Sequence, residues 1–320
     1  MTATAAVRLL GAGDIRDMAA RLGVRPTKKL GQNFVIEQGT VRKIASLAAP
    51  RPGDVILEVG PGLGSLTLAL LEAVADAAGP AFADGICGTA VRDGARLPPS
   101  GPEMIPLRLV AVEIDPVLAA QLPKTLAERA PGLASRATVL AGDALSVGER
   151  EIGSPAPTVL AANLPYNVAV PVVLNLLAAF PALERGVVMV QSEVADRMCA
   201  GPGSRVYGVP SAKLAWYAEA RPAGTVPRSV FWPVPNVDSK LVSFTRRDHP
   251  ETSASREAVF AVIDAAFGQR RKTLRAALAG WAGSPADAER TLRAAGIDPA
   301  ARGETLGITD FARIAQAATK

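Results

Sequence analysis

Short apolar runs alternate with helical patterns through the first part of the chain. The run DVILEVG, from Asp54 to Gly60, is rich in β-branched residues and ends in glycine, which is typical of a buried strand. The segment SLTLALLEA, from Ser65 to Ala73, has the apolar spacing of a helix. We therefore predict a strand, a tight turn and a helix in this order.

Four further apolar runs follow, with helical patterns between most of them. Alternation of this kind predicts a parallel sheet covered by helices, which is an α/β fold. The further strands are expected at residues 107–115, 137–144, 158–166 and 186–193.

Residues 77–106 interrupt this alternation. Ten of these thirty residues are Gly or Pro, and no apolar period is visible among them. We expect a surface insertion between the first helix and the second strand, because a connection of this composition forms no element of its own.

The segment after Phe244, TRRDHPETSAS, is polar and contains Pro250, so it is expected to be a linker. Only helical patterns follow it, and Gly268 fits the C-cap of the first of them. We therefore expect two domains, residues 1–247 with the sheet and residues 248–320 as a small all-helical domain. The expected helices of the second domain cover residues 256–267, 271–281, 286–295 and 308–318.

Composition limits the classes of partner, location and catalysis that we expect for this chain. Of its 320 residues, 49% are apolar and 4% aromatic, so a sizeable core is built mostly of small aliphatic side chains. The formal charge of +5 favours an anionic partner. No run approaches the roughly 18 apolar residues of a membrane span, and no signal-peptide pattern is visible, so we expect a soluble cytoplasmic protein. Two cysteines and one histidine, His249, form no disulfide framework or zinc motif, so no metal and no histidine-based catalysis are expected.

The segment EVGPGLG, from Glu58 to Gly64, stands between the first strand and its helix. Glycines at this position let the backbone approach a ligand and leave N–H groups facing it, so Gly60 and Gly62 predict a nucleotide-like ligand. The dehydrogenase fingerprint needs glycine where Ser65 stands, which disfavours a dehydrogenase. Taken alone, the motif also fits a purely structural turn.

Acidic residues close the next two strands. Glu113 ends the second strand and Asp143 follows the third, so both are expected at the carboxyl edge of the sheet, where open α/β folds bind ligands. A carboxylate at the second strand can accept ribose hydroxyls, and one after the third can accept the amine of an adenine ring. Together they suit a nucleoside without phosphate. Taken singly, each also fits a solvated loop carboxylate.

The tetrapeptide Asn163-Leu164-Pro165-Tyr166 follows the fourth strand and precedes an apolar helix. The exocyclic amine of adenine is a poor nucleophile because its lone pair is conjugated into the ring, so a catalyst must hold it with acceptors. The Asn163 oxygen and a backbone carbonyl next to Pro165 can do this, and Tyr166 offers a face for base stacking. A proline-stiffened turn with a core tyrosine is the structural alternative.

With these residues the chain resembles the ribosomal small-subunit (16S) RNA adenine N6,N6-dimethyltransferases of the KsgA type, which use S-adenosylmethionine and have a Rossmann-like fold. The resemblance spans nearly all of residues 25–318. It rests on seven segments in the same order: KKLGQNF (28–34), LEVGPGLGSLT (57–67), VAVEID (110–115), GDAL (142–145), NLPYNVAVPV (163–172), FWPVPNVDSKLV (231–242) and FGQRRKTLR (267–275).

The resemblance assigns roles to individual residues. It implies that Asn163 lies where cofactor and substrate meet, and that Tyr166 and Phe231 sandwich the target adenine. Val35 stands where the family usually has leucine, and the 77–106 insertion replaces a short loop. The implied cofactor contacts are Gln32, Asn33, Val35 and Gly60 at the methionine and adenosine, with Glu113 at the ribose and Asp143 at the adenine.

The implied reaction is in-line attack of N6 on the sulfonium methyl, which needs positioning and polarisation of the amine and no strong base. The resemblance implies dimethylation of two adjacent adenines near the 3′ end of small-subunit ribosomal RNA, within an immature subunit, by a monomer. Basic residues suit such an RNA, although a solvated charged surface is the alternative. Arg271 and Arg275 are expected to share one face of a helix because of their i, i+4 spacing. The candidate RNA contacts are Arg25, Lys28, Lys29, Arg270, Arg271, Lys272 and Arg275.

Three rival functions fit part of the same sequence. Large-subunit RNA methyltransferases of the macrolide-resistance type share the cofactor motifs, but NLPYNVAVP and FGQRRKTLR look more like the small-subunit family. Adenine DNA methyltransferases usually have two prolines after Asn or Asp, which Leu164 contradicts. A non-catalytic ribosome-assembly factor is the last alternative, and the presence of Asn163, Glu113 and Tyr166 favours catalysis instead.

Overall fold

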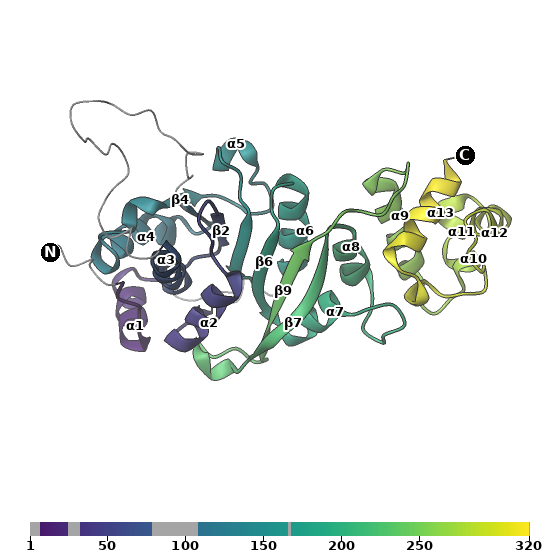
Figure 1. The fold of residues 1–320 in the computed structure, drawn as a ribbon. Helices are drawn as coiled ribbons and strands as arrows, with labels where there is room; N and C mark the ends of the chain where they lie inside the picture. The colour runs from purple at the N-terminus through teal and green to yellow at the C-terminus, as the bar shows by residue number, and fades with distance from the viewer. Residues whose placement is uncertain (1–6, 25–32, 79–107, 166–167, 320) are drawn as a thin grey trace, which may run out of the picture. The chain divides into compact units, whose positions relative to one another are not determined.

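The computed structural model describes residues 7–24, 33–78, 108–165 and 168–319. The chain divides into two compact units, which we call the sheet unit and the helical unit (Figure 1). The domain boundary after residue 247 stays a prediction. The sheet unit is Met1–Ser192 with Ala223–Ser243, and the helical unit is Glu193–Pro222 with Phe244–Lys320.

A seven-stranded sheet has the order β4-β3-β2-β5-β6-β9-β7 among the described residues. The pairs β2–β3, β2–β5, β3–β4 and β5–β6 are parallel, which confirms the predicted α/β fold (Figure 1). A separate antiparallel pair joins β1 to β8. The strands are β1 Phe34–Val35, β2 Val55–Val59, β3 Arg108–Glu113, β4 Ala137–Ala141, β5 Val159–Asn163, β6 Arg185–Gln191, β7 Ala218–Val226, β8 Phe231–Trp232 and β9 Ser239–Arg246.

The central strands are continuous apolar runs because helices cover the parallel sheet. All five residues of β2 are buried, as expected for a strand covered on both faces. Helix α2 packs against α3, β5 and β6, whereas α4 packs against β3 and β4. The helices of the sheet unit are α1 Ala12–Arg21, α2 Gln38–Ala48, α3 Ser65–Ala78, α4 Pro116–Arg129, α5 Glu149–Ile152 and α6 Ala169–Ala179, with the 3₁₀ turns η2 Ala134–Arg136 and η3 Arg228–Val230.

Helix α3 starts at the predicted residue, Ser65, and continues to Ala78, beyond the predicted end at Ala73. The first two residues of the expected insertion therefore belong to α3, and residues 79–106 of it lie outside the described residues. Strand β7 was not predicted from the sequence because Pro222 and Gly224 interrupt any apolar alternation. It stands last in the strand order, and an edge strand tolerates proline.

The helical unit contains the polar α7 and the more apolar α8, followed by helices from the carboxyl-terminal part of the chain. No helix in the described part of the chain has the length and apolarity that crossing a membrane requires. Helix α7 begins at Ser192, one residue before the helical unit itself begins. The helices are α7 Ser192–Cys199, α8 Val209–Tyr217, α9 Arg256–Gly268, α10 Leu274–Ala277, α11 Ala279–Ala282, α12 Pro285–Ala294 and α13 Ile308–Ala318, with the 3₁₀ turn η4 Gly303–Thr305.

The predicted helix over residues 271–281 is wrong. The chain turns after α9, and two short helices, α10 and α11, follow. The Leu274 backbone N–H donates to the Ala301 carbonyl at 2.7 Å, and the Arg275 N–H donates to the Pro299 carbonyl at 3.1 Å. These amides bond to a distant loop, so the helix cannot start earlier. Gly268 is the last residue of α9 and Gln269 is its C-cap, one residue later than predicted.

Candidate active site

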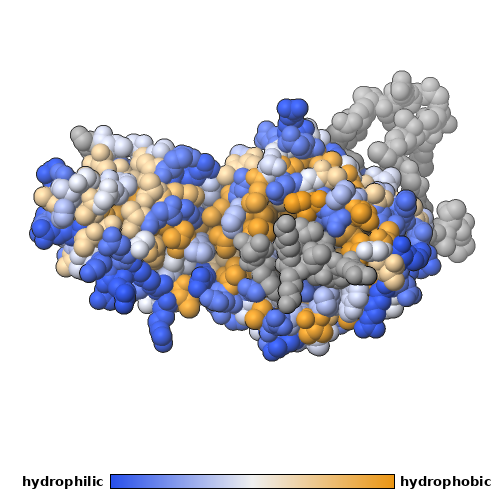
Figure 2. Space-filling view, turned by 180° about the vertical axis from the view of Figure 1, so that it is seen from behind, coloured by the Kyte–Doolittle hydropathy of each residue, from blue (hydrophilic) through white to orange (hydrophobic). Residues whose placement is uncertain are grey.

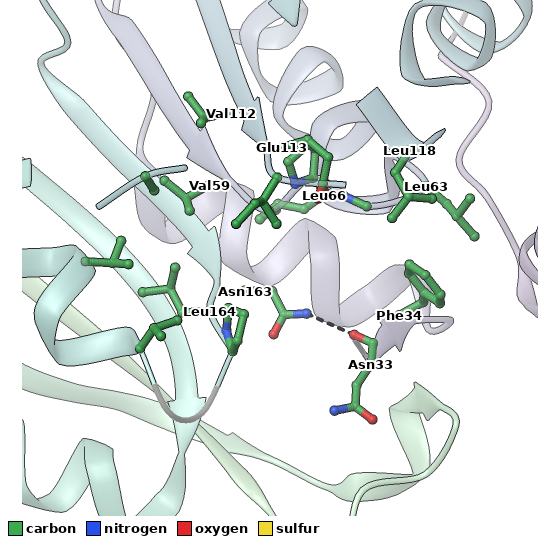
Figure 3. Close-up of a pocket in the computed structure, with 18 of the residues that line it drawn as sticks. Asn33, Phe34, Val59, Leu63, Leu66, Val112, Glu113, Leu118, Asn163 and Leu164 are labelled. Carbon is green, nitrogen blue, oxygen red and sulfur yellow. Dashed lines mark hydrogen bonds between the residues drawn. The ribbon is translucent and has the colours of Figure 1, made fainter. Parts of the chain in front are cut away.

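A cavity lies at the carboxyl ends of β2, β3 and β5, where parallel sheets bind their ligands (Figure 3). Its wall also includes the loop after β4 and the chain around β1. The structure thus brings together residues that are up to 139 positions apart in the sequence, from Asn33 to Val172. Nine predicted site residues line it: Asn33, Val35, Gly60, Gly62, Glu113, Asp143, Asn163, Leu164 and Pro165.

The glycine motif forms a turn that only glycine accommodates without strain. Gly60 and Gly62 have φ angles of +68° and +57°. A Cβ atom on Gly62 would lie 3.1 Å from the Phe34 ring, and one on Gly60 would lie 3.7 Å from the Asn163 carbonyl oxygen. The turn therefore combines a left-handed backbone with close packing at the cavity wall.

Glu113 fastens this turn to β3. Its Oε2 accepts the Gly62 backbone N–H at 2.9 Å, and its Oε1 accepts the Asp115 N–H at 2.9 Å. The side chain is buried, and burial raises the pKa of Glu113 while the two backbone hydrogen bonds lower it. Each carboxylate oxygen has a second lone pair, so both can also accept a hydroxyl of a ligand.

Glu58 is buried in the strand that leads into the turn. It is 1% exposed, and neither oxygen of its carboxyl has a hydrogen-bond partner among the described residues. Burial raises the pKa of Glu58 to about 8, and the charge of Glu113 acts in the same direction. The carboxyl is therefore mostly neutral at pH 7. Glu58 is not among the residues that line the cavity, and the sequence analysis did not single it out.

Asp143 and Ile114 lie on the same cavity wall. The Oδ1 atom of Asp143 accepts the Leu145 backbone N–H at 2.9 Å, which fixes the carboxylate at the start of the loop after β4. Ile114 is 56% exposed although it is apolar, and it lines the cavity directly after Glu113. Ile114 was not predicted from the sequence as a site residue. Its signal is an apolar residue between two acidic ones in VEID, immediately after a strand.

Asn163 ends β5 and points its side chain toward the segment before β1 (Figure 3). Its Nδ2 donates to the Asn33 carbonyl oxygen at 3.2 Å. This bond fixes the amide so that Oδ1 remains available as an acceptor. The Pro165 carbonyl accepts the Val168 N–H at 3.2 Å, which closes the turn after Asn163.

Several predicted site residues are not brought to the cavity in the described structure. Phe231 is 1% exposed and pairs with Val35 across β1 and β8, but it is absent from the described cavity wall. Its stacking role stays a prediction. The residues Gln32, Tyr166, Arg25, Lys28 and Lys29 lie outside the described residues.

The basic residues of the helical unit differ from one another in their surroundings. Arg270 forms an ion pair with Glu304 at 2.9 Å, and Arg275 forms one with Glu289 at 3.1 Å. Arg271 and Lys272 are exposed. The expected shared helix face of Arg271 and Arg275 is wrong, because Arg271 belongs to the turn that precedes α10.

Comparison with known sequences gives relatives along nearly the whole chain. A protein of Kineococcus radiotolerans called ribosomal RNA small subunit methyltransferase A is 61% identical over 307 residues, which cover 96% of this chain and 91% of the relative. A protein of Thermobifida fusca with the same name is 57% identical and covers 98% and 97% of the two chains.

Two solved structures share the fold. A dimethyladenosine transferase from Plasmodium falciparum matches with a TM-score of 0.64 at 21% identity, over 87% of this chain and 94% of that one. The 23S rRNA methyltransferase ErmE matches with a TM-score of 0.57 at 23% identity, over 90% and 100%. The family model described as ribosomal RNA adenine dimethylase matches residues 24–78 and 103–320, so the gap in the match coincides with most of the predicted insertion. With relatives of this identity and a family match over most of its length, the chain belongs to the ribosomal RNA adenine dimethylase family.

Proposed function

We propose that this protein transfers methyl groups from S-adenosylmethionine to N6 of adenines in small-subunit ribosomal RNA, giving N6,N6-dimethyladenosine. The observation that carries the proposal is the Asn163 amide, which the Asn33 carbonyl holds at 3.2 Å on the cavity wall with its oxygen available as an acceptor. The relatives named as small-subunit methyltransferases support the choice of RNA.

The residues of the cavity fit S-adenosylmethionine. Glu113 has lone pairs left for the ribose hydroxyls, Asp143 can accept the adenine amine, and the exposed Ile114 offers an apolar contact for the adenine ring. The turn at Gly60 and Gly62 lets the backbone approach the methionine end. When bound, this cofactor supplies an electrophilic methyl group on a sulfonium. The proposed cofactor contacts are Gln32, Asn33, Val35, Gly60, Gly62, Glu113, Asp143 and Asn163.

The chain acts on the target base through acceptors. The Asn163 Oδ1 and the Leu164 carbonyl accept the N6 protons, which draws the amine toward tetrahedral geometry and aligns it for in-line attack. The carboxylates in the described cavity wall, Glu113 and Asp143, are assigned to the cofactor, so the amine is activated by hydrogen bonding, and its proton leaves to water after methylation. Tyr166 and Phe231 are proposed to stack on the base, with Leu164 and Pro165 shaping the turn.

The wider setting follows from the same proposal. We infer a cytoplasmic monomer with a catalytic domain of residues 1–247 and an RNA-binding helical domain of residues 248–320. Its substrate is the small-subunit RNA within an immature subunit, at two adjacent adenines near the 3′ end. Arg25, Lys28 and Lys29 are proposed as phosphate contacts beside the cofactor site.

Transfer of labelled methyl to ribosomal subunits from a strain that lacks the modification tests this function. Small subunits, large subunits and naked RNA are offered in parallel, and the labelled nucleosides are identified. We expect dimethyladenosine with small subunits only. Labelling confined to large subunits would instead assign the resistance-type activity, and tight binding without transfer would leave an assembly factor.

The variant Asn163→Ala tests the proposed polarising residue. Removing one positioned acceptor is expected to lower the rate of transfer by about 100-fold or more, with little change in subunit binding. Gln121→Ala removes an amide from α4 that does not line the cavity, and it is the matched control. Normal transfer by Asn163→Ala would show that the assignment of the polarising group is wrong.

A further inference from the structure

Helix α6 is apolar except for one side chain. It follows the turn after Asn163, and among its eleven residues only Asn175 is polar. Val172, almost one helical turn before Asn175, lines the cavity. An amide inside an apolar helix lowers the helix propensity, and it needs hydrogen-bond partners where it is removed from water. The partner of Asn175 therefore indicates what this residue does.

The Asn175 amide reaches the loop after β4. Its Nδ2 donates to the Ala144 carbonyl oxygen at 3.1 Å, although the two residues are 31 positions apart in the sequence. Asn175 is half-buried and Ala144 is 6% exposed, so water has limited access to this hydrogen bond. The bond joins the helix that follows the turn at Asn163 to the loop that contains Asp143.

One peptide group connects the Asn175 amide to the Asp143 carboxylate. The Ala144 carbonyl and the Leu145 N–H belong to the same planar peptide, and in a trans peptide they point in opposite directions. Asn175 binds the carbonyl, and the Asp143 Oδ1 accepts the N–H at 2.9 Å. Each hydrogen bond polarises the peptide group and strengthens the other. Asn175 thus fixes the plane of the peptide that holds the Asp143 carboxylate.

The loop after β4 has few other contacts that could orient Asp143. Asp143 and Ser146 are exposed, and Leu145 is 41% exposed, one of the large apolar side chains that reach the surface of the sheet unit (Figure 2). The Ser146 N–H and hydroxyl donate to the Asp143 carbonyl within the loop itself. The Gly142 N–H donates to a carbonyl of β3 at 2.9 Å, and on the side of α6 the anchor is Asn175. Because most of the loop is exposed, these hydrogen bonds determine where the Asp143 carboxylate points.

We propose that Asn175 is a positioning residue for the cofactor. It orients the Asp143 carboxylate so that this group accepts the amine of the adenine ring, and it thereby sets the affinity and selectivity of the cavity for adenine. The inference rests on the proposed function, in which the cofactor adenine is held by Asp143. Asn175 is absent from the described cavity wall, so it acts through the loop and does not touch the cofactor.

Two ligands that differ in one amine test this role. S-adenosylhomocysteine, the form of the cofactor after methyl transfer, has the adenine amine, and S-nebularylhomocysteine has a hydrogen in its place. Since a hydrogen bond to a charged acceptor is among the stronger ones, the unaltered protein should bind the first ligand about tenfold more tightly or better. In calorimetry, Asn175→Ala should weaken binding of the first ligand about tenfold and of the second less than about twofold.

Two further variants separate the donor from the bulk of the side chain. Asn175→Asp keeps the size of the side chain but turns an acceptor toward the Ala144 carbonyl, so we expect S-adenosylhomocysteine to bind at least as weakly as in Asn175→Ala. In Asp143→Ala the carboxylate is absent, and adding Asn175→Ala should then change affinity less than about twofold, because both residues act on one contact. Alanine has a higher helix propensity than asparagine, so Asn175→Ala is expected to keep α6 folded.

Matched changes on α4 are the controls. Gln121 is a half-buried amide that does not line the cavity, and its Nε2 donates to the Thr125 hydroxyl of the same helix at 3.4 Å. Gln121→Ala and Gln121→Glu repeat the two changes made at Asn175, and we expect less than about a twofold effect on either ligand. Thermal unfolding of every variant checks that it is folded at the temperature of the assay.

Methyl transfer to small subunits that lack the modification gives a second readout. We expect the KM for S-adenosylmethionine to rise about tenfold in Asn175→Ala, while kcat at saturating cofactor is retained, because the change weakens cofactor binding and leaves the turn at Asn163 intact. A lower kcat with an unchanged KM would mean that Asn175 supports the turn at Asn163 and not Asp143, and it would overturn the inference.

The binding measurements can overturn the inference in three further ways. Unchanged affinity of Asn175→Ala or Asn175→Asp for S-adenosylhomocysteine would show that the donor is dispensable. An equal loss for both ligands would show a general loosening of the site without selection of the amine. No preference of the unaltered protein between the two ligands would remove the contact at Asp143 on which Asn175 acts. Failure of the proposed function is distinct, because the unaltered protein would then transfer no methyl.

Discussion

The buried carboxyl of Glu58 makes the stability of this protein depend on pH, and replacement by glutamine removes this dependence. Glu58 is 1% exposed and both of its carboxyl oxygens are without hydrogen-bond partners in the described structure. Glutamine has nearly the same shape as the protonated acid and never ionises. The variant Glu58→Gln therefore isolates the free energy that the titration of this one group contributes.

The magnitude follows from the two pKa values of Glu58. The ordinary value is 4.5, and burial raises the pKa in the folded protein to about 8. Between these values the unfolded chain has lost the proton and the folded protein keeps it, so the free energy of unfolding falls as the pH rises. Each pH unit costs about 1.4 kcal/mol, which gives about 3 kcal/mol at pH 7 and about 5 kcal/mol at pH 8 and above.

Thermal unfolding of the two proteins between pH 4 and pH 9 measures this cost. All other titrating groups are shared, so the difference in stability between Glu58→Gln and the unaltered protein reports Glu58 together with its coupling to Glu113. We expect a small, constant difference near pH 4 that grows in favour of the variant until about pH 8. A difference of 3 kcal/mol corresponds to roughly 6 °C or more in Tm.

Glu128→Gln, which removes an exposed carboxyl from α4, controls for the loss of one negative charge. Parallel stability curves for Glu58→Gln and the unaltered protein would refute the reasoning, because they would mean that Glu58 binds protons equally in the folded and unfolded states. If Glu58→Gln lost stability relative to the unaltered protein as the pH rises, the sign of the predicted effect would be refuted.

Three further predictions concern the sheet unit. Gly62→Ala forces a side chain into a φ of +57° and against Phe34, so we expect about 1–3 kcal/mol lower stability by thermal unfolding and weaker cofactor binding by calorimetry. Asp54→Ala removes the main partner of the half-buried Arg185 and leaves it the exposed Glu184 and the Ala49 carbonyl, so chemical denaturation should show a loss of about 3 kcal/mol. Glu113→Gln puts an amide donor against a backbone N–H that the carboxylate now accepts; equilibrium dialysis should show cofactor affinity reduced by about tenfold or more, and unchanged affinity would remove Glu113 from the ribose contact.

The elements whose structure depends on the local sequence pattern could be predicted from the sequence. The run around Val55–Val59 is apolar because helices cover both faces of the sheet, and its period is visible without any tertiary information. The same holds for the strands that end at Glu113 and Asn163, so the cavity at their carboxyl ends was predictable. Strand β7 was not, because pairing at the sheet edge stabilises it despite Pro222 and Gly224.

Where distant residues decide the structure, spacing was a poor guide. Arg271 and Arg275 have helical spacing, but hydrogen bonds to the loop around Pro299 prevent a helix from starting before Leu274. Arg270 resembles its basic neighbours in the sequence, yet Glu304, 34 residues away, engages it. The pKa of Glu58 likewise depends on burial by several elements, which a single strand pattern does not reveal.

The parallel arrangement of β2 and β3 has a practical consequence. Helix α3 starts at the cavity edge of the sheet and ends at Ala78, and β3 begins with Arg108 at the edge opposite to the cavity. The family match skips residues 79–102, between these two points. A fluorescent label or an affinity handle placed in that stretch would be joined to the framework away from the cofactor residues. The protein therefore offers an attachment point whose two junctions, Ala78 and Arg108, are both in the sheet unit and outside the cavity wall.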